Sequence, residues 1–357
     1  MSGKAKIKIG IIGMGAIGAL HADAFKSLQD AEVRAICDIA TERLKAQGER
    51  LGVPESRRFT DYRNLLDNDV DAVVVGVGNA LHREVSVAAF RAGKHVLVEK
   101  PMAMNAQEAQ EIHQASVKAQ RVLQVGMVWR QAAEIKLVRE YVENDMFGDI
   151  YHMRAVLIRR RGIPGLGGWF TTKAASGGGP LIDIGVHWFD LAMHVSGLWE
   201  PTAVSAMTYA KFGPRMKNYR YVTMWAGPPK FDGVFDVEDY AAGLVRFGKK
   251  ASMSFEMAWA ANSQDSGFIE ILGDKAGVRL CDGNPLCLLT EHGDRLVDLS
   301  PKINTNGDRF QSQAAAFLAA CRGEAPPAST SLEGVMVMKL IDAVYLSSEQ
   351  GTEVKIT

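Results

Sequence analysis

Cysteine is scarce in this sequence, and neither sign of charge is in excess. The four cysteines, Cys37, Cys281, Cys287 and Cys321, lack the spacing of a metal site and are too few for a disulfide framework. The 41 Lys and Arg residues equal the 41 Asp and Glu residues in number, and no dense basic block is present. A nucleic-acid partner is therefore not expected, because such binders carry a strong basic excess.

Long hydrophobic runs are also missing. No apolar run approaches the roughly 20 residues that a membrane-spanning helix needs. Residues 1–6 lead directly into a strand-like pattern, without the apolar core of a signal peptide. With 47% hydrophobic and 23% charged residues over 357 positions, the composition is typical of globular proteins. We expect a cytoplasmic protein of two domains, with no membrane partner.

The first third of the chain alternates β-branched apolar runs with amphipathic helical patterns. Such runs are typical of parallel strands that are buried on both faces. The alternation predicts an α/β domain over residues 1–126, built on a doubly wound parallel sheet. The expected strands are residues 7–12, 33–37, 72–77, 95–98 and 122–125, and the expected helices are residues 16–28, 41–51, 83–92 and 105–119.

From residue 127 onward, strands follow one another with few helices between them. Residues 127–357 are expected to form an α+β domain on one open sheet with antiparallel neighbours. The segments 162–179 and 211–238 are rich in glycine and aromatic residues and lack a clear period, which favours binding loops. The expected strands are residues 150–160, 203–209, 239–247, 251–259, 267–273 and 276–281, and the expected helices lie near 131–145, 181–196, 310–321 and 332–348.

Residues 13–18 (GMGAIG) stand between the first strand and the first helix, where a dinucleotide-binding turn requires them. In that reading Gly13 allows the tight turn, Gly15 lets the backbone approach a pyrophosphate, and Gly18 permits close packing of helix and strand. The helix N-terminus offers its N–H groups to the phosphates. A simple tight turn is the alternative interpretation.

Asp38 ends the second strand, twenty residues after Gly18. An acidic side chain at that place accepts hydrogen bonds from the adenosine ribose and repels a 2′-phosphate. No Arg or Lys follows at positions 39–41, which favours NAD over NADP. A helix-capping role is the alternative for this residue.

Polar residues follow the fourth and fifth strands, in the segments 77–82 (VGNALH) and 98–101 (VEKP). The carboxyl ends of parallel strands face the ligand crevice, so these residues are candidates for the site. Lys100 precedes a proline, which favours an extended or turn conformation. An ordinary surface lysine is the alternative.

Residues 181–197 (LIDIGVHWFDLAMHVSG) predict an apolar helix with a stripe of Asp and His. Asp183, His187, Asp190 and His194 are spaced by four, three and four residues, which places them on one helical face. A solvated stripe would carry Lys and Glu, so this stripe favours a cleft. No cysteine and no HExxH motif accompanies it, so no metal is expected. Buried, hydrogen-bonded histidines are the remaining alternative.

The segments GMGAIG, VEKP and GGGPLIDIGVHWFDL (177–191), together with Asp38, resemble the Gfo/Idh/MocA oxidoreductase family. The resemblance extends over nearly the whole chain. It implies an N-terminal Rossmann domain and a C-terminal domain with a large, mainly antiparallel open sheet. It also implies that the chain forms homodimers or homotetramers that cover the helix-free face of that sheet.

The same resemblance assigns roles to single residues. Lys100 and His187 are implied as catalytic, with Asp183 supporting them, and Arg130 is placed near the nicotinamide. The segment Val77-Gly78-Asn79 departs from the Thr-Pro-Asn that the family often has. The expected cofactor-binding residues are Gly13, Gly15, Ala16, Ile17, Gly18, Asp38, Asn79, His82, Glu99, Lys100 and Arg130.

We therefore expect an NAD-dependent oxidoreductase that oxidises a ring hydroxyl of a sugar, glycoside or inositol to a ketone. His187 would accept the hydroxyl proton, and Lys100 would hydrogen-bond the substrate oxygen. Two alternatives remain open. One is an NAD-dependent glycosidase acting through a transient 3-keto sugar. The other is a non-catalytic, dinucleotide-binding regulator.

The expected substrate is a neutral cyclic polyol. Asp183 and His187 suit adjacent hydroxyls, and Trp169 in the glycine-rich loop suits the apolar face of a sugar ring. Arg159, in the run 159–161, favours instead a uronic acid or a sugar phosphate, because arginine pairs well with such anions. The expected substrate-binding residues are Lys100, Arg159, Trp169, Asp183 and His187.

Overall fold

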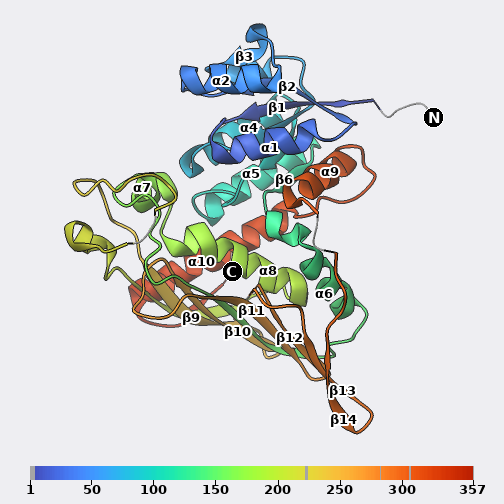
Figure 1. Ribbon diagram of the computed structural model, residues 1–357, viewed down its shortest axis with the longest axis vertical. Coiled ribbons are helices and arrows are strands. Elements are labelled where there is room, and N and C mark those ends of the chain that lie inside the picture. Colours follow the sequence, from blue (N-terminus) through green and yellow to red (C-terminus); the bar gives the residue numbers. More distant parts are fainter. Residues whose placement is uncertain (1–4, 222–223, 282, 305–306, 357) are drawn as a thin grey trace. The chain divides into compact units, whose positions relative to one another are not determined.

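The chain folds into two compact units in the computed structural model (Figure 1). Unit 1 consists of Met1–Gln131 and Asn306–Val335, and unit 2 of Ala132–Thr305 and Met336–Thr357. The sequence predicted one boundary, after residue 126, whereas the chain returns to the first unit late. The described residues are 5–221, 224–281, 283–304 and 307–356.

Unit 1 is built on a six-stranded sheet in the order β3-β2-β1-β4-β5-β6, with every neighbouring pair parallel. This confirms the predicted doubly wound parallel sheet. β4 and the last three residues of β5 are buried, as expected for strands that are covered on both faces. The strands are β1 (Ile7–Ile12), β2 (Ala31–Cys37), β3 (Arg58–Phe59), β4 (Ala72–Val75), β5 (His95–Val98) and β6 (Leu123–Val125).

Helices connect these strands, and one helix from the end of the chain joins them. On that helix, α9, Phe317 packs edge-to-face on Phe25 of α1, with ring centroids 6.2 Å apart. Both side chains belong to one buried cluster, which explains why a late segment returns to unit 1. The helices are α1 (Ala16–Lys26), α2 (Thr41–Leu51), α3 (Tyr62–Leu66), α4 (His82–Arg91), α5 (Ala106–Ala119) and α9 (Arg309–Cys321).

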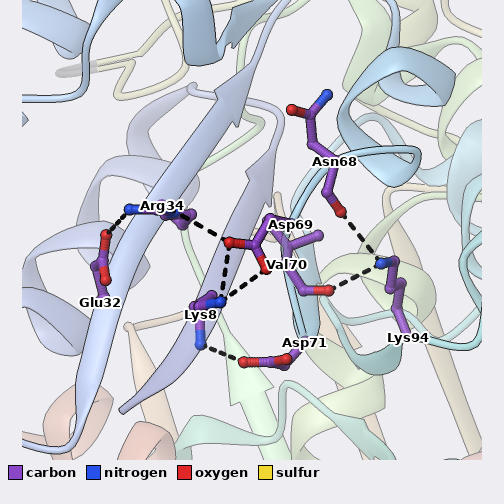
Figure 2. A network of polar contacts seen from close by, with 8 residues as sticks. All are labelled: Lys8, Glu32, Arg34, Asn68, Asp69, Val70, Asp71 and Lys94. Atoms are coloured by element: carbon purple, nitrogen blue, oxygen red, sulfur yellow. Dashed lines mark hydrogen bonds and ion pairs between the residues drawn. The ribbon is translucent and has the colours of Figure 1, made fainter.

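Charged residues at the amino ends of the strands of unit 1 pair with one another (Figure 2). Lys8 Nζ lies 2.7 Å from the Asp69 carboxylate, and its backbone N–H donates to Asp71 at 2.8 Å. Lys94 Nζ donates to the carbonyl of Val70 at 2.9 Å. These residues lie at the opposite end of the strands from Lys100, so the two ends of the sheet have different chemistry.

Unit 2 is built on a nine-stranded sheet in the order β14-β13-β12-β11-β7-β10-β9-β8-β15. β7 and β10 run parallel, and the other neighbouring pairs of the described sheet for which a register is given run antiparallel. This confirms the large, mainly antiparallel sheet. The strands are β7 (Ile150–Ile158), β8 (Ala203–Tyr209), β9 (Tyr240–Phe247), β10 (Ala251–Ala258), β11 (Ser266–Gly273), β12 (Ala276–Leu280), β13 (Leu288–His292), β14 (Arg295–Leu299) and β15 (Val354–Lys355).

Alternate residues of the central strands form the core of unit 2. Met153 and Phe255 point to the buried face, where Phe255 packs edge-to-face on Phe189 of α8, with centroids 5.0 Å apart.

Among the described residues, no helix is both long and apolar enough to cross a membrane. The helices of unit 2 are α6 (Ala133–Glu143), α7 (Lys173–Ser176), α8 (Val186–Ser196) and α10 (Ser331–Gln350), the last of which begins in unit 1.

Candidate functional site

The glycine turn between β1 and α1 has the geometry that a dinucleotide requires. Gly13 has a φ of +92°, and its N–H donates to the carbonyl of Cys37 at 2.8 Å. A Cβ on Gly18 would lie 1.8 Å from the carbonyl oxygen of Gly13, so the helix and the turn leave no room there. A Cβ on Gly15 would meet nothing within 4 Å, which leaves this side of the turn open to a ligand.

Helix α1 begins at Ala16 without a side-chain cap. Its first-turn amides, those of Ala16, Ile17 and Gly18, have no partner within the helix and suit a pyrophosphate. The residues present therefore fit a bound dinucleotide, whose phosphates the glycine turn and these amides would hold.

Asp38, just past β2, is buried and makes contacts on both sides of its carboxylate. Oδ2 accepts from the N–H of Met14 at 2.8 Å, and Oδ1 accepts from the N–H of Ala40 at 2.8 Å. Arg43 Nη1 lies 3.2 Å from Oδ2. Sequence reasoning noted that no basic residue follows at positions 39–41 but did not foresee Arg43, which the first turn of α2 brings back to the carboxylate.

Glu99 follows β5 directly and is buried next to a histidine that the sequence did not suggest. Its Oε1 lies 2.6 Å from Nε2 of His21 on α1, and its Oε2 accepts from the backbone N–H of Lys100 at 3.1 Å. Burial alone would raise the pKa of Glu99, but the hydrogen bond to His21 and the charge of Lys100 outweigh it and lower that pKa. Lys100 is thus placed at the carboxyl edge of the sheet, as predicted.

His82 connects the loops that follow β4 and β5. Its Nδ1 lies 2.7 Å from the carbonyl oxygen of Pro101, and its Nε2 lies 3.1 Å from that of Val77. The ring is fully buried, and burial lowers its pKa. A neutral ring donates at one nitrogen only, and the shorter contact favours Nδ1 as the donor. The structure therefore gives His82 a supporting role, and a contact of its side chain with the cofactor stays a prediction.

Two other predicted cofactor residues are also buried. Asn79 begins the short 3₁₀ turn Asn79–Leu81 after β4 and is 8% exposed. Arg130 has its Nη1 3.0 Å from Glu333 Oε2 and 3.0 Å from the carbonyl oxygen of Ala328. These contacts join Arg130 to the returning segment of unit 1. Its proximity to a nicotinamide stays a prediction.

In unit 2, the predicted Asp/His helix does not begin as an α-helix. Leu181–Gly185 form a π turn, and α8 continues from Val186. The sequence predicted one α-helix from residue 181, so this is a correction: the first turn is wound more widely, with i→i+5 bonds, a feature frequent at functional sites. Asp183 Oδ2 accepts from Nε1 of Trp259 at 3.0 Å.

The four polar side chains of the predicted stripe do not share one environment. Asp190 is 1% exposed and therefore part of the interior, whereas His187 and His194 are half-buried. Asp183 is buried, with 9% of its surface exposed. The stripe thus divides, because Asp190 faces the packed interior of unit 2. His187 and Asp183 remain the candidates for chemistry.

Glu238 holds the start of this helical segment, and sequence reasoning missed it. Its carboxylate accepts from the N–H groups of Gly179 and Leu181, at 3.0 and 3.1 Å, and from the Tyr345 hydroxyl at 3.0 Å. Burial raises its pKa, although these donors favour the charged form. A Cβ on Gly178 would lie 2.0 Å from the Tyr345 hydroxyl, so the glycine run is required by this contact.

The two irregular loops bring aromatic rings together. Trp169 is 46% exposed and packs at a tilt of 30° on Phe170, with centroids 3.8 Å apart, and Phe170 meets Trp225 edge-on at 5.1 Å. In the arginine run, Arg161 lies over the ring of Phe212 at 4.5 Å and donates to the carbonyl of residue 261 at 3.0 Å. Arg161 is therefore engaged by neighbouring segments of unit 2, so an anionic ligand would depend on the other arginines of the run.

Comparison with known proteins identifies families and relatives that share this architecture. Two family models match: the oxidoreductase family with an NAD-binding Rossmann fold over residues 7–127, and the GFO/IDH/MocA C-terminal domain over residues 135–279. The D-glucoside 3-dehydrogenase of Escherichia coli (strain K12) is 31% identical over 354 residues, covering 98% of this chain and 97% of that protein.

Solved structures agree in fold. An oxidoreductase domain protein from Kribbella flavida matches with a TM-score of 0.85 at 26% identity, covering 99% of this chain and 100% of that chain. Levoglucosan dehydrogenase in complex with NADH matches with a TM-score of 0.85, covering 99% of each chain. At 22% identity, the second likeness concerns the fold alone.

The glycine turn of unit 1, the acidic residue after β2 and the matching Rossmann model define an NAD-binding oxidoreductase architecture. Unit 2 carries the second half of the same architecture, a mixed sheet in which antiparallel pairs predominate. The chain belongs to the Gfo/Idh/MocA oxidoreductase family, and its relatives include sugar and inositol dehydrogenases.

Proposed function

We propose that this protein is an NAD-dependent dehydrogenase that oxidises a ring secondary hydroxyl of a sugar, glycoside or inositol to a ketone. The observation that carries the proposal is the placement of Lys100. It follows β5 at the carboxyl edge of the sheet that also holds the glycine turn. Glu99 accepts from its backbone N–H, and His82 contacts the carbonyl of the next residue, Pro101. The relative named D-glucoside 3-dehydrogenase supports the substrate class.

In the proposed reaction, the side chains of this protein bind the substrate and move one proton. His187 accepts the hydroxyl proton, since imidazole titrates near neutral pH. Lys100 hydrogen-bonds the substrate oxygen and stabilises the alkoxide-like charge of the transition state. Asp183, held by Trp259, orients substrate hydroxyls. The dinucleotide, when bound, supplies the hydride acceptor.

NAD is the proposed cofactor in preference to NADP. The Asp38 carboxylate accepts the N–H of Met14 in the glycine turn and would meet a 2′-phosphate with a like charge. Arg43 beside it favours a phosphate, but its charge is already paired with Asp38 at 3.2 Å. A tenfold or larger preference for NADP would overturn this part of the proposal.

The proposed substrate is a neutral pyranose or glycoside. Trp169 offers an exposed indole in the loop region of unit 2, and Asp183 and His187 offer hydrogen bonds to neighbouring hydroxyls. Arg161 is engaged by loop carbonyls and by Phe212, which leaves less positive charge for an anionic substrate. Arg159 remains the candidate for binding a uronic acid or a sugar phosphate.

The test is a screen for NADH formation against inositols, free sugars, glycosides and sugar acids, with the Lys100→Ala variant as control. A dehydrogenase accumulates NADH with one class of substrate. A glycosidase that acts through a 3-keto sugar releases the aglycone without net NADH. A regulator binds the dinucleotide and turns over nothing, and that outcome would overturn the proposal.

We also propose that the protein is a cytoplasmic homodimer or homotetramer. The four cysteines, all among the described residues, are not joined in disulfides, in keeping with a reducing compartment. The sheet of unit 2 exposes large side chains on β8 and β9, among them Met207, Tyr209 and Leu244, which a second copy would cover. Sedimentation at micromolar concentration tests this: a 38.9 kDa species would contradict it.

A further inference from the structure

The backbone next to Lys100 makes a side-chain contact on each side of this residue, at its own N–H and at the carbonyl of Pro101. On the amino side, the N–H of Lys100 donates to Glu99 Oε2 at 3.1 Å, and Glu99 Oε1 lies 2.6 Å from Nε2 of His21. On the carboxyl side, the carbonyl oxygen of Pro101 lies 2.7 Å from Nδ1 of His82. Two buried histidines, His21 of α1 and His82 of α4, therefore contact Glu99 and Pro101, the neighbours of Lys100 on either side.

The contact between His21 and Glu99 is enclosed by neighbouring side chains. His21 is 0% exposed, and the ring of Phe310 on α9 packs edge-on against it, with centroids 5.2 Å apart. A Cβ on Gly126, just past β6, would lie 2.8 Å from Glu99 Oε1, so the carboxylate occupies a space that only glycine leaves open. The Glu99 carboxylate thus lies between His21, the Lys100 N–H and Gly126.

His21 also lies on the helix that carries the cofactor turn. It stands three residues after Gly18, whose close approach to Gly13 fixes α1 against the turn. A chain of two hydrogen bonds thus runs from α1 through the Glu99 carboxylate to the amide of Lys100. The helix that would bind the pyrophosphate and the lysine that would contact the substrate are joined through these bonds.

We propose that His21 is a positioning residue for Lys100, acting through Glu99, with His82 holding the other side of the same segment. This inference rests on the proposed function, in which Lys100 contacts the substrate. The role of His21 is to hold the backbone of Lys100 so that the ammonium group reaches the substrate oxygen in a fixed geometry. Misplacement of a reacting group by about 1 Å can cost about a hundredfold in rate, so the effect should be large.

The test compares His21→Ala with His21→Gln, whose amide retains an N–H donor for the carboxylate. We expect His21→Ala to lower kcat about tenfold or more while the Kd for NADH changes less than about twofold. We expect His21→Gln to recover most of that loss. His113→Ala is the matched control for His21→Ala, because it removes the contact of His113 on α5 with the Ser331 hydroxyl at 2.8 Å, which does not involve Glu99 or Lys100.

Hydrogen exchange gives a measurement that needs no turnover. The amide of Lys100, in peptides covering residues 98–102, should exchange faster in His21→Ala than in wild type and in His113→Ala. If wild type oxidises no sugar, the proposed function fails, while this exchange result still decides whether His21 holds Lys100. The inference is overturned if exchange over 98–102 is unchanged. It is also overturned if kcat falls only in proportion to lost NADH-binding capacity, with His21→Gln no better than His21→Ala.

Discussion

The indole N–H of Trp259 donates to the carboxylate of Asp183 at 3.0 Å, and Trp259 itself is completely buried. Trp259 directly follows β10, so this hydrogen bond connects the sheet of unit 2 to the π turn that contains Asp183. A hydrogen bond to a charged group contributes about 1.5–3 kcal/mol, enough to hold a short side chain in one orientation. Asp183 is therefore positioned by the sheet as well as by its own helix.

Removing that donor should disturb substrate binding or turnover. We expect Trp259→Phe to lower kcat/KM by roughly tenfold to a hundredfold, from the loss of about 1.5–3 kcal/mol. Steady-state kinetics measure this. Trp188→Phe is the control, because the indole N–H of Trp188 donates to the carbonyl of residue 268 at 3.0 Å and not to Asp183. Equal losses in the two variants would show that packing, not the bond to Asp183, is responsible.

Lys100 gives the most direct prediction. Lys100→Ala should reduce turnover by about a hundredfold or more, since charge stabilisation at the reacting oxygen is lost. Binding of NADH, followed by fluorescence, should stay within about twofold, because the pyrophosphate site is intact. Lys94→Ala serves as a control, because Lys94 bonds backbone carbonyls at the amino ends of the strands. Near-normal turnover in Lys100→Ala would end the assignment.

Cofactor preference should depend on Asp38. Asp38→Asn keeps the size of the side chain and removes the charge that repels a 2′-phosphate. We expect the ratio of NAD to NADP affinity to fall about tenfold, about 1.4 kcal/mol. The same titration with Arg43→Ala should keep or strengthen the preference for NAD, because the arginine is the nearby group that attracts phosphate. An unchanged ratio in Asp38→Asn would contradict this assignment.

Trp169 tests the substrate class. If its exposed indole stacks on a sugar ring, Trp169→Ala should raise KM for neutral sugars severalfold to about tenfold, as expected for an aromatic contact of about 0.5–1.5 kcal/mol. Trp225→Ala, which removes the edge-on neighbour of Phe170, separates a direct contact from a general effect on the loops. Activity with anionic substrates only, lost on replacing Arg159, would make the neutral-sugar assignment wrong.

His82 predicts a pH dependence of stability. Burial lowers the pKa of its ring in the folded chain. As pH falls below about 6.5, the unfolded chain takes up a proton that the folded chain does not, so the free energy of unfolding decreases until the folded pKa is passed. Urea midpoints between about pH 7.5 and 5.5 should therefore fall on acidification. The slope should be smaller in His82→Gln, and the same slope in both proteins would refute the role of this residue.

The elements that the sequence predicts correctly are those whose local residue pattern is sufficient to identify them. The run AVVV of β4 and the GMGAIG turn needed no distant partner to be interpreted, because buried strands and glycine turns have local requirements. The glycine run 177–179 is evident in the sequence, but the reason why glycine is required there is not. Glycine is needed there because Glu238 and Tyr345, far away in the sequence, occupy the space that a Cβ would take.

The missed features depend on partners that are distant along the chain. β3 and β15 have two residues each and exist only through their neighbours in the sheet. His21 looked like one more residue of an amphipathic helix, and its contact with Glu99 spans 78 positions. Similarly, the π turn at Leu181–Gly185 follows a pattern that an α-helix would satisfy equally well.

The late return of α9 to unit 1 has a consequence for the protein during its synthesis. The cluster that contains Phe25 also contains Ala314, Phe317 and Leu318 of α9, which leave the ribosome after nearly the whole chain. Until then, the cofactor half carries an uncovered apolar strip on α1, a surface of the kind that chaperones bind. A gene fragment ending at residue 131 would expose that strip permanently. A soluble cofactor domain would need α9 joined to it by a linker.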